Sequence, residues 1–219
     1  LAQTYHRGES LIPTMSRATA LLTGVGWPAL ALTALLGHEI VLALYGATWL
    51  ASVPAILPLT IAAAVGMTFN YIHPAIVAIG RPYLSAIPVL VTLATRIGFG
   101  VALFDGGLTG FAWALCWASL AATPIVIMQQ QRYFHWGLIP LLRAMVPSAW
   151  VAAGTAAAGA LLNLAVPADW PALVRLLVML TPLALFWYLM LRITRHELLD
   201  EVHRMAATVK MRLGRLLPT

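Results

Sequence analysis

Arg96 is the residue of this sequence whose surroundings most clearly suggest chemistry. It lies inside the apolar stretch Leu90–Leu103, and no acidic residue occurs within eight positions on either side. An arginine near the middle of a membrane-spanning helix costs from about 2.5 to well above 10 kcal/mol, so it needs a counter-charge, a carbonyl cluster or a watered cavity. The planar guanidinium offers a fork of donors that suits phosphate.

Four further polar residues could share a cavity with Arg96. Ser85, Thr92 and Arg96 follow one another at spacings of seven and four, which puts them on one face of a helix. Asn70 and His73 are three positions apart on another expected helix and would project together. We therefore predict a substrate cavity lined by Arg96, Thr92, Ser85, Asn70 and His73. The alternative is that Arg96 binds the last carbonyls of a broken neighbouring helix and that the other polar residues only pack.

The sequence offers little for covalent or metal chemistry. Cys116 is the single cysteine, which excludes an intrachain disulfide and a cysteine metal cluster. No paired carboxylates or metal-binding histidine pair occurs; the histidines are scattered as His6, His38, His73, His135, His196 and His203. We therefore predict a transporter rather than an enzyme, with no catalytic residue, metal or cofactor.

Composition indicates a membrane protein. Of the 219 residues 61% are hydrophobic and 9% are charged, whereas soluble domains carry about 25% charged residues. Apolar runs long enough to cross a bilayer predict an all-α polytopic fold, and a buried soluble helical core is the alternative. The six expected spans are Ala18–Leu36, Val53–Ile79, Leu84–Phe104, Leu108–Met128, Met145–Val166 and Leu173–Leu191.

Basic residues predict the orientation of these spans. Of the 13 lysines and arginines, eleven fall in segments on one side of the membrane, Arg175 falls on the other side, and Arg96 lies within a span. Because cytoplasmic loops are enriched in basic residues, we expect both ends to be cytoplasmic. Basic residues interspersed with apolar runs also suit anionic lipid headgroups better than nucleic acid.

The expected organisation has three parts. Residues 1–17 are a cytoplasmic segment that starts at Leu1, as part of a longer protein would, and residues 18–191 form the six-helix lobe. Residues 192–219 repeat apolar positions at helical spacing with basic residues between them, which predicts an amphipathic helix on the anionic membrane surface. A solvated tail is the alternative.

Prolines and small residues indicate how the spans pack. Every expected span contains proline, Pro74 and Pro182 among them, which suggests bent helices around a cavity. Alanines recur every four residues, at 114, 118 and 122 and again at 152, 156 and 160, and such spacing permits close helix contact. Alternatively, alanine is merely common here.

Three local patterns carry a family resemblance. They are "HEIVLALYGATWLASVPAILPL" at His38–Leu59, "AIGRPYL" at Ala78–Leu84, and "GGLTGFAWAL" at Gly106–Leu115. Together, from about Ala18 to Val166, the chain resembles the C-terminal half of the polysaccharide-transport flippases. These belong to the multidrug/oligosaccharidyl-lipid/polysaccharide exporter superfamily, which includes the O-antigen flippases.

The resemblance implies a two-lobe fold in which this chain supplies one six-helix lobe and the N-terminal lobe of the same protein supplies the other. Such proteins move isoprenoid-pyrophosphate-linked oligosaccharides across the bacterial inner membrane, through a basic cavity in which Arg96 fits by character. The alternatives are a multidrug or lipid II exporter of the same superfamily, a fragment of a membrane glycosyltransferase or acyltransferase, and a membrane scaffold that transports nothing.

Overall fold

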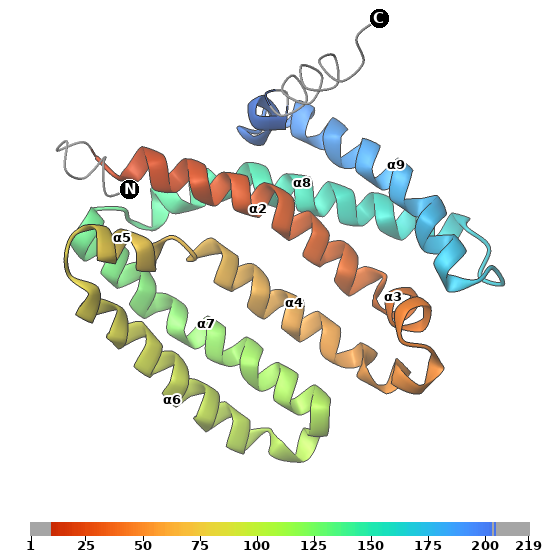
Figure 1. The fold of residues 1–219 in the computed structure, drawn as a ribbon, viewed down its shortest axis with the longest axis horizontal. Helices are drawn as coiled ribbons and strands as arrows, with labels where there is room; N and C mark the ends of the chain where they lie inside the picture. Colours follow the sequence, from red (N-terminus) through yellow and green to blue (C-terminus); the bar gives the residue numbers. More distant parts are fainter. Residues whose placement is uncertain (1–9, 203, 205–219) are drawn as a thin grey trace, which may run out of the picture.

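The computed structural model describes residues 10–202 and 204, and within them it contains helices and no strand. Six candidate membrane spans have the required length and apolar composition. The predicted all-α fold with six spans is therefore confirmed (Figure 1). The helices are α2 (Ile12–Leu35), α3 (Gly37–Leu44), α4 (Val53–Thr68), α5 (Ile72–Ala78), α6 (Ala86–Ala102), α7 (Gly107–Phe134), α8 (Leu138–Ala165) and α9 (Ala172–Ile193), with the 3-10 helices η1 (Ala47–Ser52), η2 (Pro82–Ser85) and η3 (Phe104–Gly106).

Several helices are longer than their apolar stretches. Helix α2 begins at Ile12, six residues before the expected start, and so takes in part of the segment expected to precede it. Helix α7 continues to Phe134 and α8 begins at Leu138. Backbone hydrogen bonding continues a helix without regard to side-chain polarity, whereas hydropathy detects only the part that matches the hydrocarbon layer.

The second expected span is interrupted between α4 and α5. Pro74 has no backbone N–H, and its ring clashes with the carbonyl four residues earlier, which belongs to Asn70. The chain turns at residues 69–71, and helical bonding resumes where the Ala75 N–H donates to the Tyr71 carbonyl oxygen at 3.1 Å. The helical spacing expected to align Asn70 with His73 is therefore absent.

The long helices form an open row. The closest packing runs in the order α9, α8, α2, α4, α7 and α6, so that α6 and α9 lie at opposite ends (Figure 1). Only 11% to 33% of the most apolar part of each span is buried within the described structure. Most of the surface of this row is therefore left for lipid or for another part of the protein.

Small residues line the helix contacts at the centre of the row. Ala114, Ala118 and Ala122 of α7 are buried, as the close contact expected of them requires. In α8 Val151, Thr155 and Gly159 are buried, and each lies one position before one of the expected alanines at 152, 156 and 160, which are half-buried. A Cβ added to Gly159 would lie 2.7 Å from a methyl carbon of Leu32 in α2, so the two helices approach closely here.

A buried hydrogen-bond chain joins α2 and α8 to the segment after α9. The Leu198 N–H donates to His196 Nδ1 at 3.1 Å, which leaves the proton of the neutral ring on Nε2. Nε2 lies 2.9 Å from Ser148 Oγ, which lies 2.7 Å from Thr23 Oγ1. The chain thus turns back onto the bundle at His196. The remainder of the expected amphipathic tail, residue 203 and residues 205–219, lies outside the described residues.

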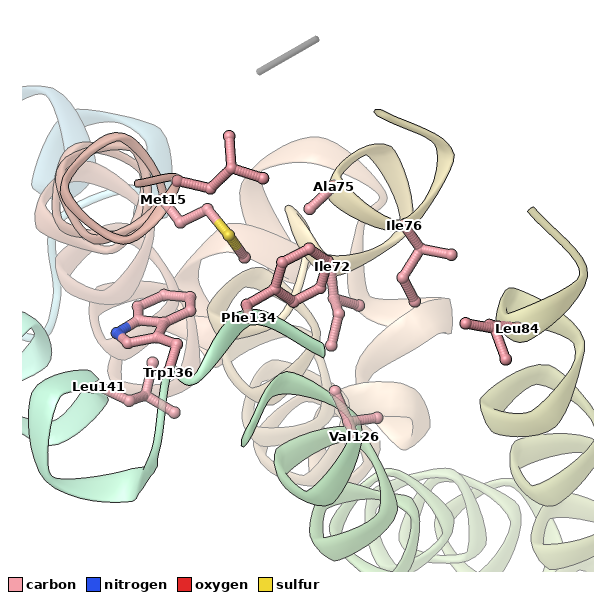
Figure 2. Packing of buried hydrophobic residues seen from close by; sticks show 10 residues of the cluster. Met15, Ile72, Ala75, Ile76, Leu84, Val126, Phe134, Trp136 and Leu141 are labelled. Atoms are coloured by element: carbon pink, nitrogen blue, oxygen red, sulfur yellow. The ribbon is translucent and has the colours of Figure 1, made fainter. Parts of the chain in front are cut away.

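An apolar cluster holds the helix ends together where α2 begins and α7 ends. Figure 2 shows side chains from α2, α5, α7 and α8 converging there, with Trp136 in the short α7–α8 connection. Trp136 is 1% exposed, and Met15 of α2 and Ile76 of α5 are fully buried. This cluster fixes α5 and η2, the elements that carry His73 and Ser85. Its buried members are Leu11, Met15, Ile72, Ala75, Ile76, Leu84, Val126, Phe134, Trp136 and Leu141.

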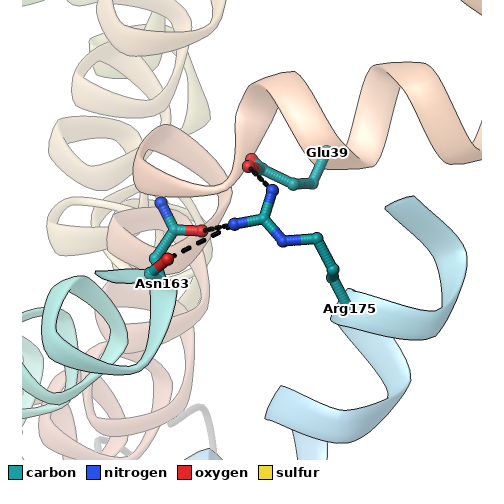
Figure 3. A network of polar contacts seen from close by, with 3 residues as sticks. All are labelled: Glu39, Asn163 and Arg175. Carbon is teal, nitrogen blue, oxygen red and sulfur yellow. Dashed lines mark hydrogen bonds and ion pairs between the residues drawn. The ribbon is translucent and has the colours of Figure 1, made fainter. Parts of the chain in front are cut away.

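A buried ion pair braces the helices at the end of the bundle opposite this cluster (Figure 3). Arg175, in the first turn of α9, donates from Nη1 to Glu39 Oε1 of α3 at 2.9 Å. Its Nη2 donates to the side-chain oxygen of Asn163 at 2.7 Å and lies 3.3 Å from the Asn163 carbonyl oxygen. The side chains of Arg175 and Glu39 are only 11% and 9% exposed. These contacts tie α3 and α8 to α9.

The first prediction concerns this ion pair. Glu39→Gln should lower the free energy of unfolding by about 3–5 kcal/mol, because it leaves the buried Arg175 charge without compensation. A matched control is Arg17→Gln, which removes an ion pair with Glu201 at 3.6 Å between largely exposed side chains. That control should cost about 0–1 kcal/mol. Apparent melting temperatures of the purified protein in detergent measure both effects, and equal shifts in the two variants would contradict the bracing role.

The second prediction concerns His196. Burial lowers the pKa of His196, because desolvation disfavours the charged imidazolium. In the unfolded chain the histidine binds a proton below its ordinary pKa of about 6.5, whereas the folded protein resists protonation. Stability from this group is therefore fully present above that pH and is lost as the pH falls below it.

The test compares apparent melting temperatures at about pH 7.5 and about pH 5.5, on either side of the ordinary histidine pKa. The wild-type protein should lose more stability on acidification than His196→Gln, which has no group to titrate at this position. An identical pH dependence in the two proteins would show that His196 does not contribute it.

Candidate functional site

A hollow of about 440 Å³ lies between α5, η2 and α6, and four of the five predicted cavity residues line it. His73 belongs to α5, Ser85 ends η2, and Thr92 and Arg96 lie four positions apart on α6. The hollow is otherwise lined by the apolar residues Ile72, Ile76, Pro88, Val89 and Leu93.

A direct contact between His73 and Ser85 joins two elements of the hollow. His73 Nδ1 lies 2.9 Å from Ser85 Oγ, across the turn that separates α5 from η2. The sequence of this turn explains the approach, since Gly80 takes a φ of +72° and Pro82 opens η2. Left-handed backbone of this kind favours glycine, so the glycine permits the reversal that brings the two side chains together.

Arg96 has no compensating charge in the described part of the chain. The ion pairs there join Arg17 and Arg204 to Glu201, and Arg175 to Glu39. Arg96 is exposed on α6, and within the described residues it makes neither an ion pair nor a hydrogen bond. The alternative was that Arg96 binds the carbonyls of a broken helix. The helix is indeed broken between α4 and α5, but in the described structure Arg96 makes no hydrogen bond to its carbonyls.

Asn70 is not among the residues that line this hollow. It lies in the turn between α4 and α5 and is exposed there. Its expected alignment with His73 depended on a continuous helix, and the Pro74 interruption removes that continuity.

The side chains of the hollow suit the binding of an anion. A guanidinium, two hydroxyls and an imidazole can all donate hydrogen bonds to phosphate oxygens. A serine beside a histidine is also the start of a nucleophile–base pair, but such a base normally needs a third group to orient it. In the described residues the second ring nitrogen of His73 has no such partner, and no cluster of three or more metal-binding side chains occurs there.

Two buried polar clusters that the sequence did not predict lie outside the hollow. Glu39 and Arg175 carry opposite charges at the same expected membrane face, and this was the available signal for their pairing. Nothing in the sequence pattern singled out His196 as the partner of Ser148, which lies 48 positions away. Both clusters are internally paired and hold helices together.

The hollow itself is the basis for assigning a function to this chain. Comparison with protein families, with curated proteins and with solved structures gives no match.

Proposed function

We propose that this chain is one lobe of a flippase that carries isoprenoid-pyrophosphate-linked oligosaccharides across the bacterial inner membrane for cell-surface polysaccharide synthesis, including lipopolysaccharide. The observation that most supports this proposal is the unpaired Arg96, which belongs to a candidate membrane span and lines the hollow between α5, η2 and α6. A charge at that depth is costly unless a watered cavity or an anion compensates it. An anionic lipid-linked substrate supplies that compensation during transport.

The length of the polar lining supports an extended anion. Ser85 and Arg96 are eleven positions apart, which corresponds to about 16 Å along a helix. Arg96 and Ser85 both line the hollow, together with His73 and Thr92. Donors spread along such a lining match a pyrophosphate with its first sugar better than a single small ion.

The open row of helices supports a second lobe as partner. Helix α6, which carries Arg96 and Thr92, has no fully buried residue. A substrate cavity needs walls on both sides, and an N-terminal lobe of the same protein would provide the missing wall. Rocking of two such lobes around a fixed site is a common form of alternating access.

The proposal places both ends of the chain in the cytoplasm, since the basic residues lie mainly on that side. Cysteines at Ala51 in η1 and at Leu108 in α7, introduced singly in a Cys116→Ser background, should then react with a membrane-impermeant thiol reagent added to intact cells. Tyr83→Cys in η2 is the matched control, because Tyr83 is 68% exposed at the opposite end. If only Tyr83→Cys is labelled in intact cells, the orientation is the opposite of the one proposed.

The central prediction concerns Arg96 in the full-length protein. Arg96→Ala should abolish export of finished polysaccharide and leave the amount of inserted protein unchanged. Loss of a charge-assisted hydrogen bond weakens binding by about tenfold or more. Arg96→Lys should keep part of the activity, because the charge survives while the planar fork is lost. Arg81→Ala, in the exposed turn outside the hollow, is the control and should export normally.

Surface polysaccharide and membrane-inserted protein are measured in the same cells. Normal polysaccharide export and unchanged drug resistance in Arg96→Ala would rule out the cavity role. Depletion of both Arg96 variants from the membrane would instead identify Arg96 as a residue that braces the helices. Normal polysaccharide export together with loss of drug resistance would favour the multidrug alternative.

A further inference from the structure

A second hollow lies between the start of α6 and the end of α7, and no residue that lines it lines the first hollow. It has a volume of about 390 Å³. The two helix ends meet at one end of the bundle (Figure 1). Along α7 its lining changes from apolar to polar: Ile125 and Met128 precede Gln129, Arg132 and Tyr133. Ile125 and Arg132 are seven positions apart, or about 10 Å along the helix, and Arg132 lies near the end of the candidate span Phe104–Phe134.

Arg132 supplies an available cation at the polar end of this hollow. Its guanidinium carbon lies 5.9 Å from the centre of the Tyr133 ring, and the side chain is exposed. Within the described residues it pairs with no carboxylate. A guanidinium in this position can form two parallel hydrogen bonds to a phosphodiester. Basic pockets between helices at a membrane surface commonly hold lipid headgroups for this reason.

The side-chain oxygen of Gln129, which also lines this hollow, is a hydrogen-bond acceptor without a donor in the described structure. Its Nε2 donates to the Leu84 carbonyl oxygen at 3.0 Å, which fixes the orientation of the amide. Its Oε1 is buried and has no hydrogen-bond partner in the described structure. An unsatisfied buried acceptor is unfavourable, so a ligand donor that reaches it gains binding free energy. Because Oε1 is closed to solvent, the side chains at the rim must move before a ligand donor reaches it.

We infer that this hollow binds a membrane phospholipid whose headgroup carries a hydrogen-bond donor. The lipid phosphate accepts hydrogen bonds from Arg132, the headgroup donor reaches Gln129 Oε1, and an acyl chain lies along Ile87, Ile125 and Met128. A free phosphate would leave the apolar half of the hollow unused. Phosphatidylcholine would leave Gln129 unsatisfied, because its trimethylated nitrogen has no N–H.

Native mass spectrometry of the full chain in detergent tests this inference with two lipids of identical acyl chains. Phosphatidylethanolamine and phosphatidylcholine have the same net charge and differ by the methyl groups that remove the donor. We expect phosphatidylethanolamine to bind about tenfold more tightly, as one charge-assisted hydrogen bond provides. Arg132→Gln should weaken binding of both lipids, whereas Arg143→Gln, which is exposed on α8 and lines neither hollow, should bind as the wild type does.

Each contrary outcome overturns a stated part of the inference. Equal binding of the two lipids would remove the role of Gln129. Unchanged binding by Arg132→Gln, with an unchanged melting temperature, would show that lipid binds elsewhere. Displacement of phosphatidylethanolamine by millimolar inorganic phosphate would identify a free-anion site in place of a lipid site.

Discussion

A chain that spans a membrane must satisfy its backbone polar groups internally, and the rest of this structure depends on that constraint. Helices meet it everywhere except at an interruption such as the turn before Pro74, where the Asn70 carbonyl loses its helical partner. That interruption separates α5 from α4 and allows α5 to pack into the apolar cluster around Trp136. His73 then lies beside Ser85 at the start of α6. The hollow forms next to this interruption, between α5, η2 and α6.

The polar groups inside the bundle divide into two kinds. Arg175 and Glu39 at one end, and His196 and Ser148 near the other, are buried and paired. Such contacts convert groups that are costly in lipid into links between helices. Arg96 differs in both respects, since it is exposed and lacks a partner within the described residues. Bracing explains the paired groups but not Arg96, which is why the proposed function rests on that residue.

The sequence was informative wherever a local rule applies. Hydropathy identified the six spans, and helical spacing brought Thr92 and Arg96 to one hollow. The sequence did not predict contacts between distant segments. Arg175 contacts Glu39, which lies 136 positions away, and no periodicity encodes that pairing. Asn70 shows another limit, because its predicted place assumed an unbroken helix. The information to correct it was in the sequence, since Pro74 lies four positions later.

The two hollows meet at the first residues of the α6 segment. Gln129 of α7 holds the Leu84 carbonyl, and the next residue, Ser85, contacts His73 of α5. Two hydrogen bonds on adjacent residues therefore anchor the start of α6 to separate helices. Ile87 then faces the hollow shared with α7, while Pro88 and Val89 face the hollow that contains Arg96. Because these residues belong to one helix, α6 forms a wall of both hollows, and its start is fixed by both hydrogen bonds.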